Sequence, residues 1–288
     1  MNNNSSLSHR RQEPEKGILY FVGTPIGNLS DISSRALNIL KNVSLVACED
    51  TRQTKKIMTK YGISNTLMSF NQTNGKKKIP QIIKLLKEAN AVALVSDAGM
   101  PSICDPGEEL VKEARLNIIE TICIPGASAV LTALVSSGYP SSKFIFEGFL
   151  PKKSISRKKL LLEISKNEKT TILYESPHRL KKLLLDLKVY CGGKREIQVS
   201  RELTKKFEEH IGTDIDKVIS YFENKEILGE ITVVIKGIKK PKKNFINDTS
   251  EIRKELIELV NAGLSLSEAS KYLARKKNLS KREVYNTY

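Results

Sequence analysis

Short apolar runs alternate with helical patterns through the first half of the chain, and this alternation constrains the fold more than any other feature. The strand-like runs are ILYFVGT (18–24), SLVACED (44–50), NTLMSF (65–70), AVALVSD (91–97) and IIETICI (118–124). Helical patterns start near Ser33, run through Lys60, cover 77–89, lie near 108–115 and extend from Ala127 to Gly138. Strands separated by helices pair in parallel, and helices then cover both faces of the sheet. We therefore predict an α/β domain with a mainly parallel sheet over residues 17–140.

A second alternating unit follows, and we assign it to residues 141–238. Its strand-like runs are KFIFEGFL (143–150), TTILYES (170–176), EIQVSREL (196–203), KFEEHIGT (206–213) and GEITVVIKG (229–237), with helical patterns at 178–190 and 214–224. Two of these runs follow each other without a helix between them, which favours antiparallel neighbours. The second domain should therefore hold a mixed sheet.

The two ends of the chain differ from these domains. Residues 1–16 are polar, no signal or anchor follows them, and no apolar run reaches membrane-spanning length, so we expect a disordered leader and a cytoplasmic protein. After the linker IKKPKKN, residues 245–288 show three short helical patterns, two of them opened by capping boxes at Ser265 and Ser280. These patterns predict a helix-turn-helix-like tail. A helical cap packed on the second domain would show the same patterns.

The charge balance favours a polyanionic partner. Lys and Arg number 48 against 32 Asp and Glu, a formal net charge of +16, and cations that neutralise phosphates release counterions. The segment PKKSISRKK (151–159) holds five cations and no acid, and residues 239–288 hold 12 Lys and Arg against 6 Asp and Glu. Both regions are therefore candidate RNA-backbone contacts, although a solvated basic surface is an alternative reading.

Cysteine and histidine usage indicates no metal site. Four cysteines occur singly, without CxxC spacing, and only three histidines are present; the cysteines are Cys48, Cys104, Cys123 and Cys191. Structural zinc needs clustered ligands. We expect the cysteines to be small buried residues in a reducing compartment.

Three unusual loops follow predicted strands: GTPIGN (23–28), SDAGMPSICDPG (96–107) and PGAS (125–128). Ligands of parallel sheets bind at the carboxyl ends of the strands. Neither GxxxxGK[ST] nor GxGxxG is present, which disfavours phosphate-rich cofactors. The carboxylate of Asp97 and exposed carbonyl groups suit a cationic ligand rich in hydrogen-bond donors, such as S-adenosylmethionine. Alternatively, the glycines and prolines only shape tight turns.

Seven strings occur in the order and spacing of a known family: VGTPIGNLSDIS (22–33), ACEDTRQT (47–54), SDAGMPSICDPG (96–107), PGASA (125–129), FEGFLP (146–151), ILYESPHR (172–179) and GEITVVIKG (229–237). The chain thereby resembles the ribosomal RNA small-subunit methyltransferase I family, the cytidine 2′-O-methyltransferases within the tetrapyrrole methylase superfamily. The resemblance covers residues 17–237, and the tail is similar to that family's C-terminal helix-turn-helix piece. ACEDTR and ESPHR are its specific strings.

The resemblance implies a homodimeric enzyme with two α/β domains that uses S-adenosylmethionine to methylate a cytidine ribose in the decoding region of 16S rRNA, in the small ribosomal subunit. Carried over position by position, the cofactor contacts of the superfamily fall on Pro25, Ile26, Asp97, Gly99, Met100, Ser128, Ala129, Tyr174, Glu230 and Thr232. Many of these contacts are expected from backbone atoms.

Candidate catalytic bases stand in the two specific strings: Glu49 and Asp50 in ACEDTR, and Glu175 and His178 in ESPHR. Alignment of the reacting groups can lower the barrier by ~7–11 kcal/mol, whereas a positioned base adds roughly 10²–10⁴-fold. We hypothesise that Glu175 or Asp50 orients or deprotonates the ribose hydroxyl. The acids of ACEDTR could instead cap a helix, and His178 could be an exposed polar residue.

The remaining site candidates are cations that could bind phosphates: Arg52, Lys152, Lys153, Arg157, Lys158 and Arg179. Two other functions stay open at this point. The protein could methylate a tetrapyrrole at carbon, whose carboxylates would also suit basic residues. It could also be a nucleic-acid-binding regulator that senses a ligand and acts through its tail.

Overall fold

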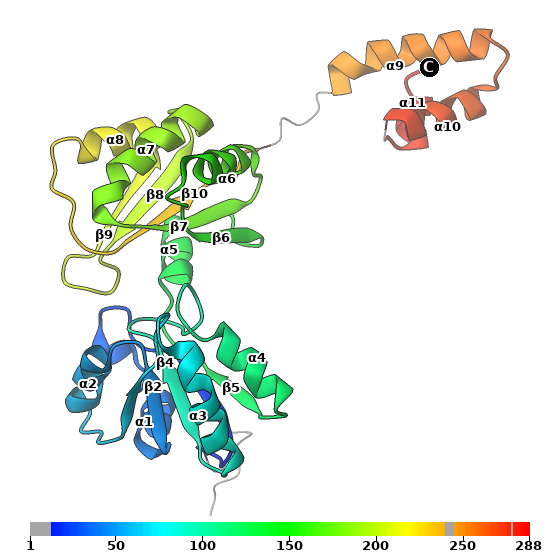
Figure 1. Ribbon diagram of the computed structural model, residues 1–288. Helices are drawn as coiled ribbons and strands as arrows, with labels where there is room; N and C mark the ends of the chain where they lie inside the picture. The colour runs from blue at the N-terminus through cyan, green and yellow to red at the C-terminus, as the bar shows by residue number, and fades with distance from the viewer. Residues whose placement is uncertain (1–12, 240–244, 278) are drawn as a thin grey trace, which may run out of the picture. The chain divides into compact units, whose positions relative to one another are not determined.

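The computed structural model describes residues 13–239, 245–277 and 279–288 (Figure 1). The chain divides into two compact units, one ending at Gly237 and one beginning at Ile238. The first unit contains two five-stranded sheets. The division of this unit into domains at residues 17–140 and 141–238 stays a prediction.

The first sheet has the strand order β3-β2-β4-β1-β5, and all of its pairings are parallel, as predicted. Its strands are β1 (Leu19–Val22), β2 (Leu45–Cys48), β3 (Leu67–Ser69), β4 (Val92–Val95) and β5 (Thr121–Ile124). Because β4, β1 and β5 are neighbours, the loops that follow these three strands leave the sheet side by side.

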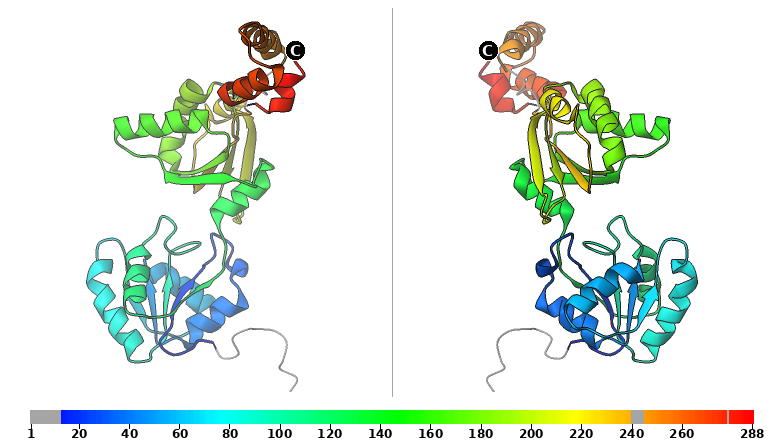
Figure 2. Two further views of the ribbon diagram at one scale, coloured as in Figure 1. Left: turned by 90° about the vertical axis from the view of Figure 1, so that its right-hand side faces the viewer. Right: turned by 90° about the vertical axis from the view of Figure 1, so that its left-hand side faces the viewer.

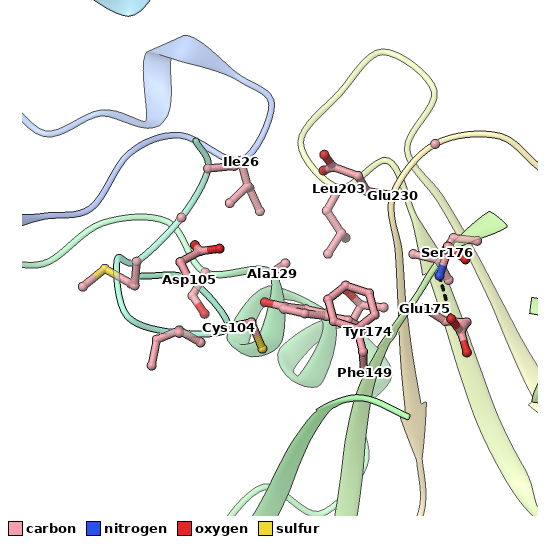
Figure 3. Close-up of a pocket in the computed structure, with 18 of the residues that line it drawn as sticks. Ile26, Cys104, Asp105, Ala129, Phe149, Tyr174, Glu175, Ser176, Leu203 and Glu230 are labelled. Atoms are coloured by element: carbon pink, nitrogen blue, oxygen red, sulfur yellow. Dashed lines mark hydrogen bonds between the residues drawn. The ribbon is translucent and has the colours of Figure 1, made fainter. Parts of the chain in front are cut away.

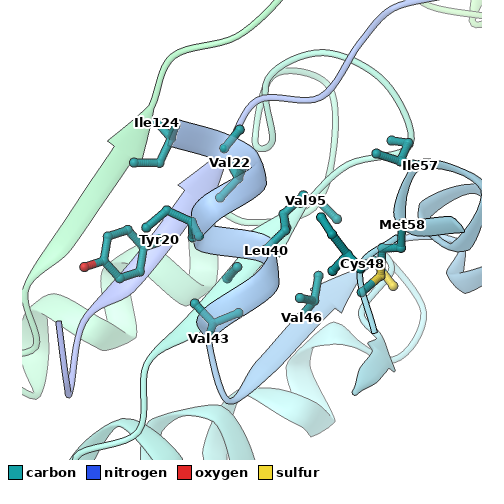
Figure 4. Close-up of a cluster of buried hydrophobic side chains, with 14 of the residues drawn as sticks. Tyr20, Val22, Leu40, Val43, Val46, Cys48, Ile57, Met58, Val95 and Ile124 are labelled. Carbon is teal, nitrogen blue, oxygen red and sulfur yellow. The ribbon is translucent and has the colours of Figure 1, made fainter. Parts of the chain in front are cut away.

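Helices cover both faces of this sheet, because successive side chains of each buried strand point to opposite faces. The helices are α1 (Ser34–Asn42), α2 (Thr51–Lys60), α3 (Gly75–Lys87) and α4 (Glu108–Leu116), and a short 3₁₀ turn, η1 (Leu29–Asp31), precedes them. Tyr20 and Val22 pack with residues of α1 and α2 in one apolar core (Figure 4). Leu19 and Phe21 pack in a second core with α3 and α4.

The second sheet has the order β6-β7-β10-β8-β9 and mixed pairing, as predicted: β6 and β7 are parallel, and the other neighbours are antiparallel. Its strands are β6 (Phe144–Phe149), β7 (Thr170–Glu175), β8 (Glu196–Arg201), β9 (Glu209–Asp214) and β10 (Ile231–Ile235). Helices α6 (Ser154–Lys166), α7 (Pro177–Cys191) and α8 (Ile215–Phe222) supply one apolar core against it.

Helix α5 (Ala129–Ser137) joins the two sheets. It follows β5 of the first sheet, yet Val130, Ala133 and Leu134 pack with residues of β7 and β10 in the second sheet. Figures 1 and 2 show α5 beside this second sheet. Ile26, from the loop after β1, belongs to the same cluster, so the two sheets share apolar contacts.

Helix α6 was not predicted. The sequence predicts an exposed cation run over residues 151–159, but a helix begins at Ser154. Its own residues Leu161 and Ile164 are buried. Arg157 lies on the same buried stripe because positions i, i+4 and i+7 share one face of a helix.

The C-terminal unit consists of α9 (Phe245–Asn261), α10 (Leu266–Lys277) and α11 (Lys281–Tyr285). This unit has a separate apolar core, in which Ile252, Leu256 and Leu273 pack with Val284. Ser280 and Glu283 form a complete capping box at the start of α11, as the sequence predicts.

The described residues include only the last part of the predicted leader, residues 13–16. Of the predicted leader, residues 1–12 lie outside the described residues, and Glu13 pairs with Arg35 at 2.6 Å.

All four cysteines are free, and the expectation that they are buried is correct for Cys48 but wrong for Cys104 and Cys123, which are exposed. Among the described residues, no helix meets the length and hydropathy needed to cross a bilayer, and no cluster of His, Cys, Asp and Glu could hold a metal ion.

Candidate functional site

The three unusual loops meet in one place. Thr24 and Gly99 form an antiparallel bridge, with N···O distances of 2.9 and 3.1 Å, so the loop after β1 is tied to the loop after β4. Gly99 has a φ of 78°, a left-handed conformation that glycine adopts without strain. A Cβ added to Gly126 would lie 2.7 Å from the Cα of Gly23, so the loop after β5 is pressed against the first. Only glycines allow this approach.

A cavity of about 380 Å³ opens beside these loops (Figure 3). One wall comes from the loops of the first sheet, and the other comes from β6, β7 and β10 with their adjoining residues. Eight of the ten predicted cofactor residues line it, namely Ile26, Gly99, Met100, Ser128, Ala129, Tyr174, Glu230 and Thr232. A cavity of this size suits a small organic ligand.

The other two predicted cofactor residues lie outside the lining. Pro25 is buried next to Ile26. Asp97 is directed toward the end of β2, where its Oδ1 accepts a hydrogen bond of 2.9 Å from the backbone N–H of Asp50. The carboxylate of Asp97 therefore links two loops of the first sheet.

The structure separates the roles of the two acids in ACEDTR. Asp50 caps α2, and its carboxylate accepts hydrogen bonds from the backbone N–H and the guanidinium of Arg52, which lower the pKa of Asp50 to about 2. A carboxylate of such low pKa is a weak base. Burial raises the pKa of Glu49, and the nearby charges of Asp105 and Asp97 raise it further. Glu49 is the better candidate base of the two.

Asp105 is a cavity residue that the sequence analysis did not single out. It lines the cavity from the loop after β4. Burial raises the pKa of Asp105 most. A hydrogen bond from Ser96 lowers this pKa, and the charge of Asp97 raises it. The pKa of Asp97 is also raised, chiefly by burial. Two acids in the string SDAGMPSICDPG, eight residues apart, were the available signal, because both follow the same strand.

Glu175 belongs to the cavity lining, but its carboxylate does not point into the cavity. Strand alternation directs Tyr174 into the cavity and the Glu175 side chain to the opposite side of β7 (Figure 3). That side chain has no exposed surface; its Oε1 accepts a hydrogen bond from the backbone N–H of Ser176 at 2.9 Å and lies 3.3 Å from Nε of Arg179. Glu175 is thus a buried, ion-paired carboxylate behind the cavity wall.

Two cations predicted to bind RNA belong to this buried cluster. The Arg157 side chain is 8 % exposed; its Nε donates to Asp186 at 2.8 Å, and its guanidinium lies 4.0 Å from Glu175. Arg179 donates to the carbonyl of Leu150 at 2.8 Å. The contacts with Asp186 and Glu175 balance the buried charge of Arg157. The Arg179 side chain is 27% exposed and pairs with Glu175.

The remaining predicted RNA contacts are accessible. Lys152 and Lys153 precede α6, Lys158 lies on its exposed face, and all three are exposed. The Arg52 side chain is 86 % exposed while it pairs with Asp50. His178, the other candidate base, is exposed at the start of α7 and is absent from the cavity lining.

The second wall of the cavity is largely apolar. Burial, with the neighbouring Cys104 and Asp105, raises the pKa of Tyr174 to about 12, so its phenol stays protonated and can donate a hydrogen bond. The rings of Phe146 and Phe149 contact Tyr174 at centroid distances of 4.9 and 5.6 Å. Leu203 completes this wall. The sequence analysis missed Phe149 and Leu203 because no charge or glycine pattern marks them.

The chemistry of the lining fits S-adenosylmethionine. The carboxylate of Asp105 is an acceptor for a cationic ligand with amino donors. Ser128 and Ala129 form the N-terminus of α5, where backbone N–H groups attract a negatively charged group. An amino acid portion carries both charges, and the apolar side chains of Ile26 and Leu203 suit an adenosine portion.

Comparisons with known proteins agree with this fold. Residues 18–219 match the family model of the Tetrapyrrole (Corrin/Porphyrin) Methylases. Among solved structures, a cobalt precorrin-4 methyltransferase aligns with a TM-score of 0.59 and 15% identity over 76% of this chain and 95% of that chain. A diphthine synthase aligns with a TM-score of 0.58 and 14% identity over 76% of this chain and 90% of that chain. The chain therefore has the fold of the tetrapyrrole methylases and belongs to that class of proteins.

Curated relatives narrow the class. Several relatives of this chain are named Ribosomal RNA small subunit methyltransferase I. The relative from Thermotoga maritima is 48% identical to this chain over 77% of this chain and 99% of its own length. The relative from Bacillus subtilis is 41% identical over 95% of this chain and 94% of its own length. The relative from Synechocystis is 41% identical over 93% of this chain and 96% of its own length. The chain belongs to the ribosomal RNA small subunit methyltransferase I family.

Proposed function

We propose that this protein transfers a methyl group from S-adenosylmethionine to the 2′-hydroxyl of a cytidine ribose in small-subunit rRNA. The observation that carries the proposal is the convergence of eight predicted cofactor residues on one cavity, in a chain whose relatives are named for rRNA methylation. The choice of a cytidine, its ribose and the decoding region of 16S rRNA comes from the family resemblance.

When bound, S-adenosylmethionine supplies a methyl group that its positively charged sulfur activates for transfer. The chain has to hold the ribose oxygen in line with that group, and alignment of this kind can supply most of the acceleration. The bridge between Thr24 and Gly99 and the contact between Gly23 and Gly126 fix the loops that line the site. A preorganised cavity therefore supports the reaction more than any single base.

A carboxylate near the cavity can accept the proton of the hydroxyl. We favour Asp105, which lines the cavity, with Glu49 as the second candidate; burial raises the pKa of each, which makes both stronger bases than an ordinary carboxylate. The earlier candidates are less suited, because Asp50 has a low pKa and Glu175 points away. We assign Glu175 to positioning the segment from Tyr174 to Pro177 in the cavity wall.

The basic surface supports an rRNA partner. Lys152, Lys153 and Lys158 are exposed close in sequence to the cavity residue Phe149, and the C-terminal unit adds cations on helices that form their own core. We retain these lysines, and Arg52, as RNA contacts. We assign Arg157 and Arg179 to contacts within the protein instead, because Arg157 pairs with Asp186 and Arg179 pairs with Glu175.

A homodimer in the cytoplasm completes the proposal. The outer face of α5 exposes Leu131 and Val135, which lie one helical turn apart and have exposed fractions of 53% and 79%. Apolar side chains gathered in this way favour a protein partner. Light scattering of the purified protein, compared with Val135→Lys, tests the dimer.

The two alternatives receive less support. The solved tetrapyrrole methylases share 13–16% identity with this chain and therefore only its fold, whereas the rRNA methyltransferases share 36–48%. A ligand-sensing regulator finds no support among these relatives, which are named as methyltransferases.

The experiment that tests the function uses labelled S-adenosylmethionine and small ribosomal subunits from a strain lacking the enzyme. We expect label in rRNA at a ribose, mapped as a 2′-O-methyl group, and none in a tetrapyrrole. A triple variant with glutamine at Lys152, Lys153 and Lys158 should bind rRNA more weakly, with a salt slope smaller by roughly 2–3. Label in a tetrapyrrole alone would refute the proposal.

A further inference from the structure

Phe149 is exposed although it lines the cavity. The ring stands at the end of β6 with an exposed fraction of 53%, and it contacts Tyr174 at a centroid distance of 5.6 Å and an interplanar angle of 57°. One part of the ring is thus packed and the rest is open (Figure 3). The chain has eight phenylalanines and no tryptophan. A large aromatic surface left open at a ligand cavity indicates a second ligand group that covers it.

A second exposed apolar side chain lines the same cavity from the loop after β4. Ile103 is 48% exposed and lies between Ser102 and Cys104, whose φ angles are 70° and 64°. Non-glycine residues in this left-handed region are strained, and such strain concentrates at ligand sites. The loop therefore holds Ile103 at the cavity by a strained backbone rather than burying it in the core.

Cations follow Phe149 at once along the chain. Lys152 and Lys153 lie three and four residues later, and Lys158 and Lys159 lie on the exposed part of α6; all four are exposed. Within the described ranges, none of them has a carboxylate within 4.0 Å. An open aromatic ring that is followed along the chain by exposed cations matches a nucleotide, whose base stacks while its phosphates attract the cations.

We infer that Phe149 is the surface on which the base of the methylated nucleotide stacks, with Ile103 as an apolar contact and Lys152 and Lys153 on the adjoining phosphates. The inference rests on the proposed function. A ribose inside a helical stack cannot bring its 2′-hydroxyl into a cavity between two walls, so the nucleotide has to turn outward. A base that leaves its stack is stabilised by an aromatic side chain.

The test compares Phe149→Leu and Phe149→Tyr with the control Phe144→Leu. Phe144 stands on the same strand, is 38% exposed and does not line the cavity. The substrate is the small ribosomal subunit from a strain lacking the enzyme. Three quantities are measured: kcat/KM for subunits, the Kd of S-adenosylmethionine by calorimetry, and the Tm.

Phe149→Leu should lower kcat/KM for subunits by roughly 5- to 150-fold, the range expected for the loss of one base–aromatic stack. Its Kd for S-adenosylmethionine and its Tm should match those of the wild type, because leucine keeps the packing but not the flat ring. Phe149→Tyr should recover most of kcat/KM, and Phe144→Leu should keep it.

Two results would overturn the inference. Wild-type kcat/KM in Phe149→Leu would show that no base stacks there, and an equal loss of affinity for S-adenosylmethionine would assign the ring to the cofactor. Methyl transfer by the wild-type protein tests the proposed function separately. Absence of methyl transfer by that protein would remove both.

Discussion

The backbone N–H of Asp50 donates a hydrogen bond to Oδ1 of Asp97 at 2.9 Å, and this bond joins the end of β2 to the end of β4. Asp97 therefore holds the start of the loop that carries Gly99, Met100 and Asp105 into the cavity. The residue was predicted as a cofactor contact, and the bond gives it a supporting function.

This bond predicts different effects for two variants of Asp97. Asp97→Ala removes the acceptor and should destabilise the protein by about 1 kcal/mol, and it should weaken binding of S-adenosylmethionine as the loop loosens. Asp97→Asn keeps an acceptor oxygen and should retain most of the affinity. Calorimetry and thermal unfolding measure both effects. Equal loss of affinity in the two variants would instead indicate that the negative charge itself contacts the ligand.

The close approach of Gly23 and Gly126 gives a second prediction. In Gly126→Ala the new Cβ would lie 2.7–2.9 Å from three backbone atoms of Gly23, so the loops must separate. We expect a destabilisation of about 1–3 kcal/mol and a loss of affinity for S-adenosylmethionine of at least about tenfold. Gly212→Ala is the matched control, since its Cβ would meet only Gln198 at 3.5 Å. Unchanged affinity in Gly126→Ala would show that loop contact is not needed.

The buried cluster behind β7 predicts a large difference between neighbouring cations. Arg157→Met leaves Asp186 and Glu175 without one of their partners and should destabilise the protein by about 3–5 kcal/mol. Lys158→Met, on the exposed side of α6, should change the stability by less than about 0.5 kcal/mol. Urea unfolding measures both. If Arg157 and Lys158 behaved alike, Arg157 would have to be exposed in solution.

The raised pKa of Asp105 predicts how stability depends on pH. A carboxyl with a higher pKa in the folded protein opposes folding when it is ionised, so its unfavourable contribution grows as the pH rises through the folded pKa. Asp105→Asn should therefore be more stable than the wild type at pH 7. The difference should disappear below the ordinary Asp value of 3.8, where both states are protonated. Parallel stability curves from pH 3.5 to 7 would contradict this account.

The periodicity of the sequence predicts most of the fold, because buried parallel strands and amphipathic helices have distinct apolar patterns. It did not predict α6, since the five cations of residues 151–159 conceal the stripe that continues through Leu161 and Ile164. An arginine on a buried stripe has the same sequence signal as one on a surface. Only the position of its acidic partners, Glu175 and Asp186, distinguishes the two.

The candidate site was predicted only in part, because the sequence pattern does not give the position of a side chain in space. Gly99 and Asp105 lie in the same family string, but only Gly99 was assigned to the cofactor. The approach of Asp105 to the cavity depends on how the loop folds back. The orientation of Glu175 could have been predicted, because adjacent residues of a strand face opposite sides. If Tyr174 faces the cofactor, Glu175 cannot.

The central claim is that the loops after β1, β4 and β5 form a site for a cationic methyl donor rather than for phosphates. Titration calorimetry on the purified protein tests it most directly, with S-adenosylmethionine, its demethylated product and a nucleoside triphosphate as separate ligands. We predict saturable binding of the first two and no binding of the triphosphate in the cavity. Saturable uptake of the triphosphate, with no heat from S-adenosylmethionine or its product, would contradict the account.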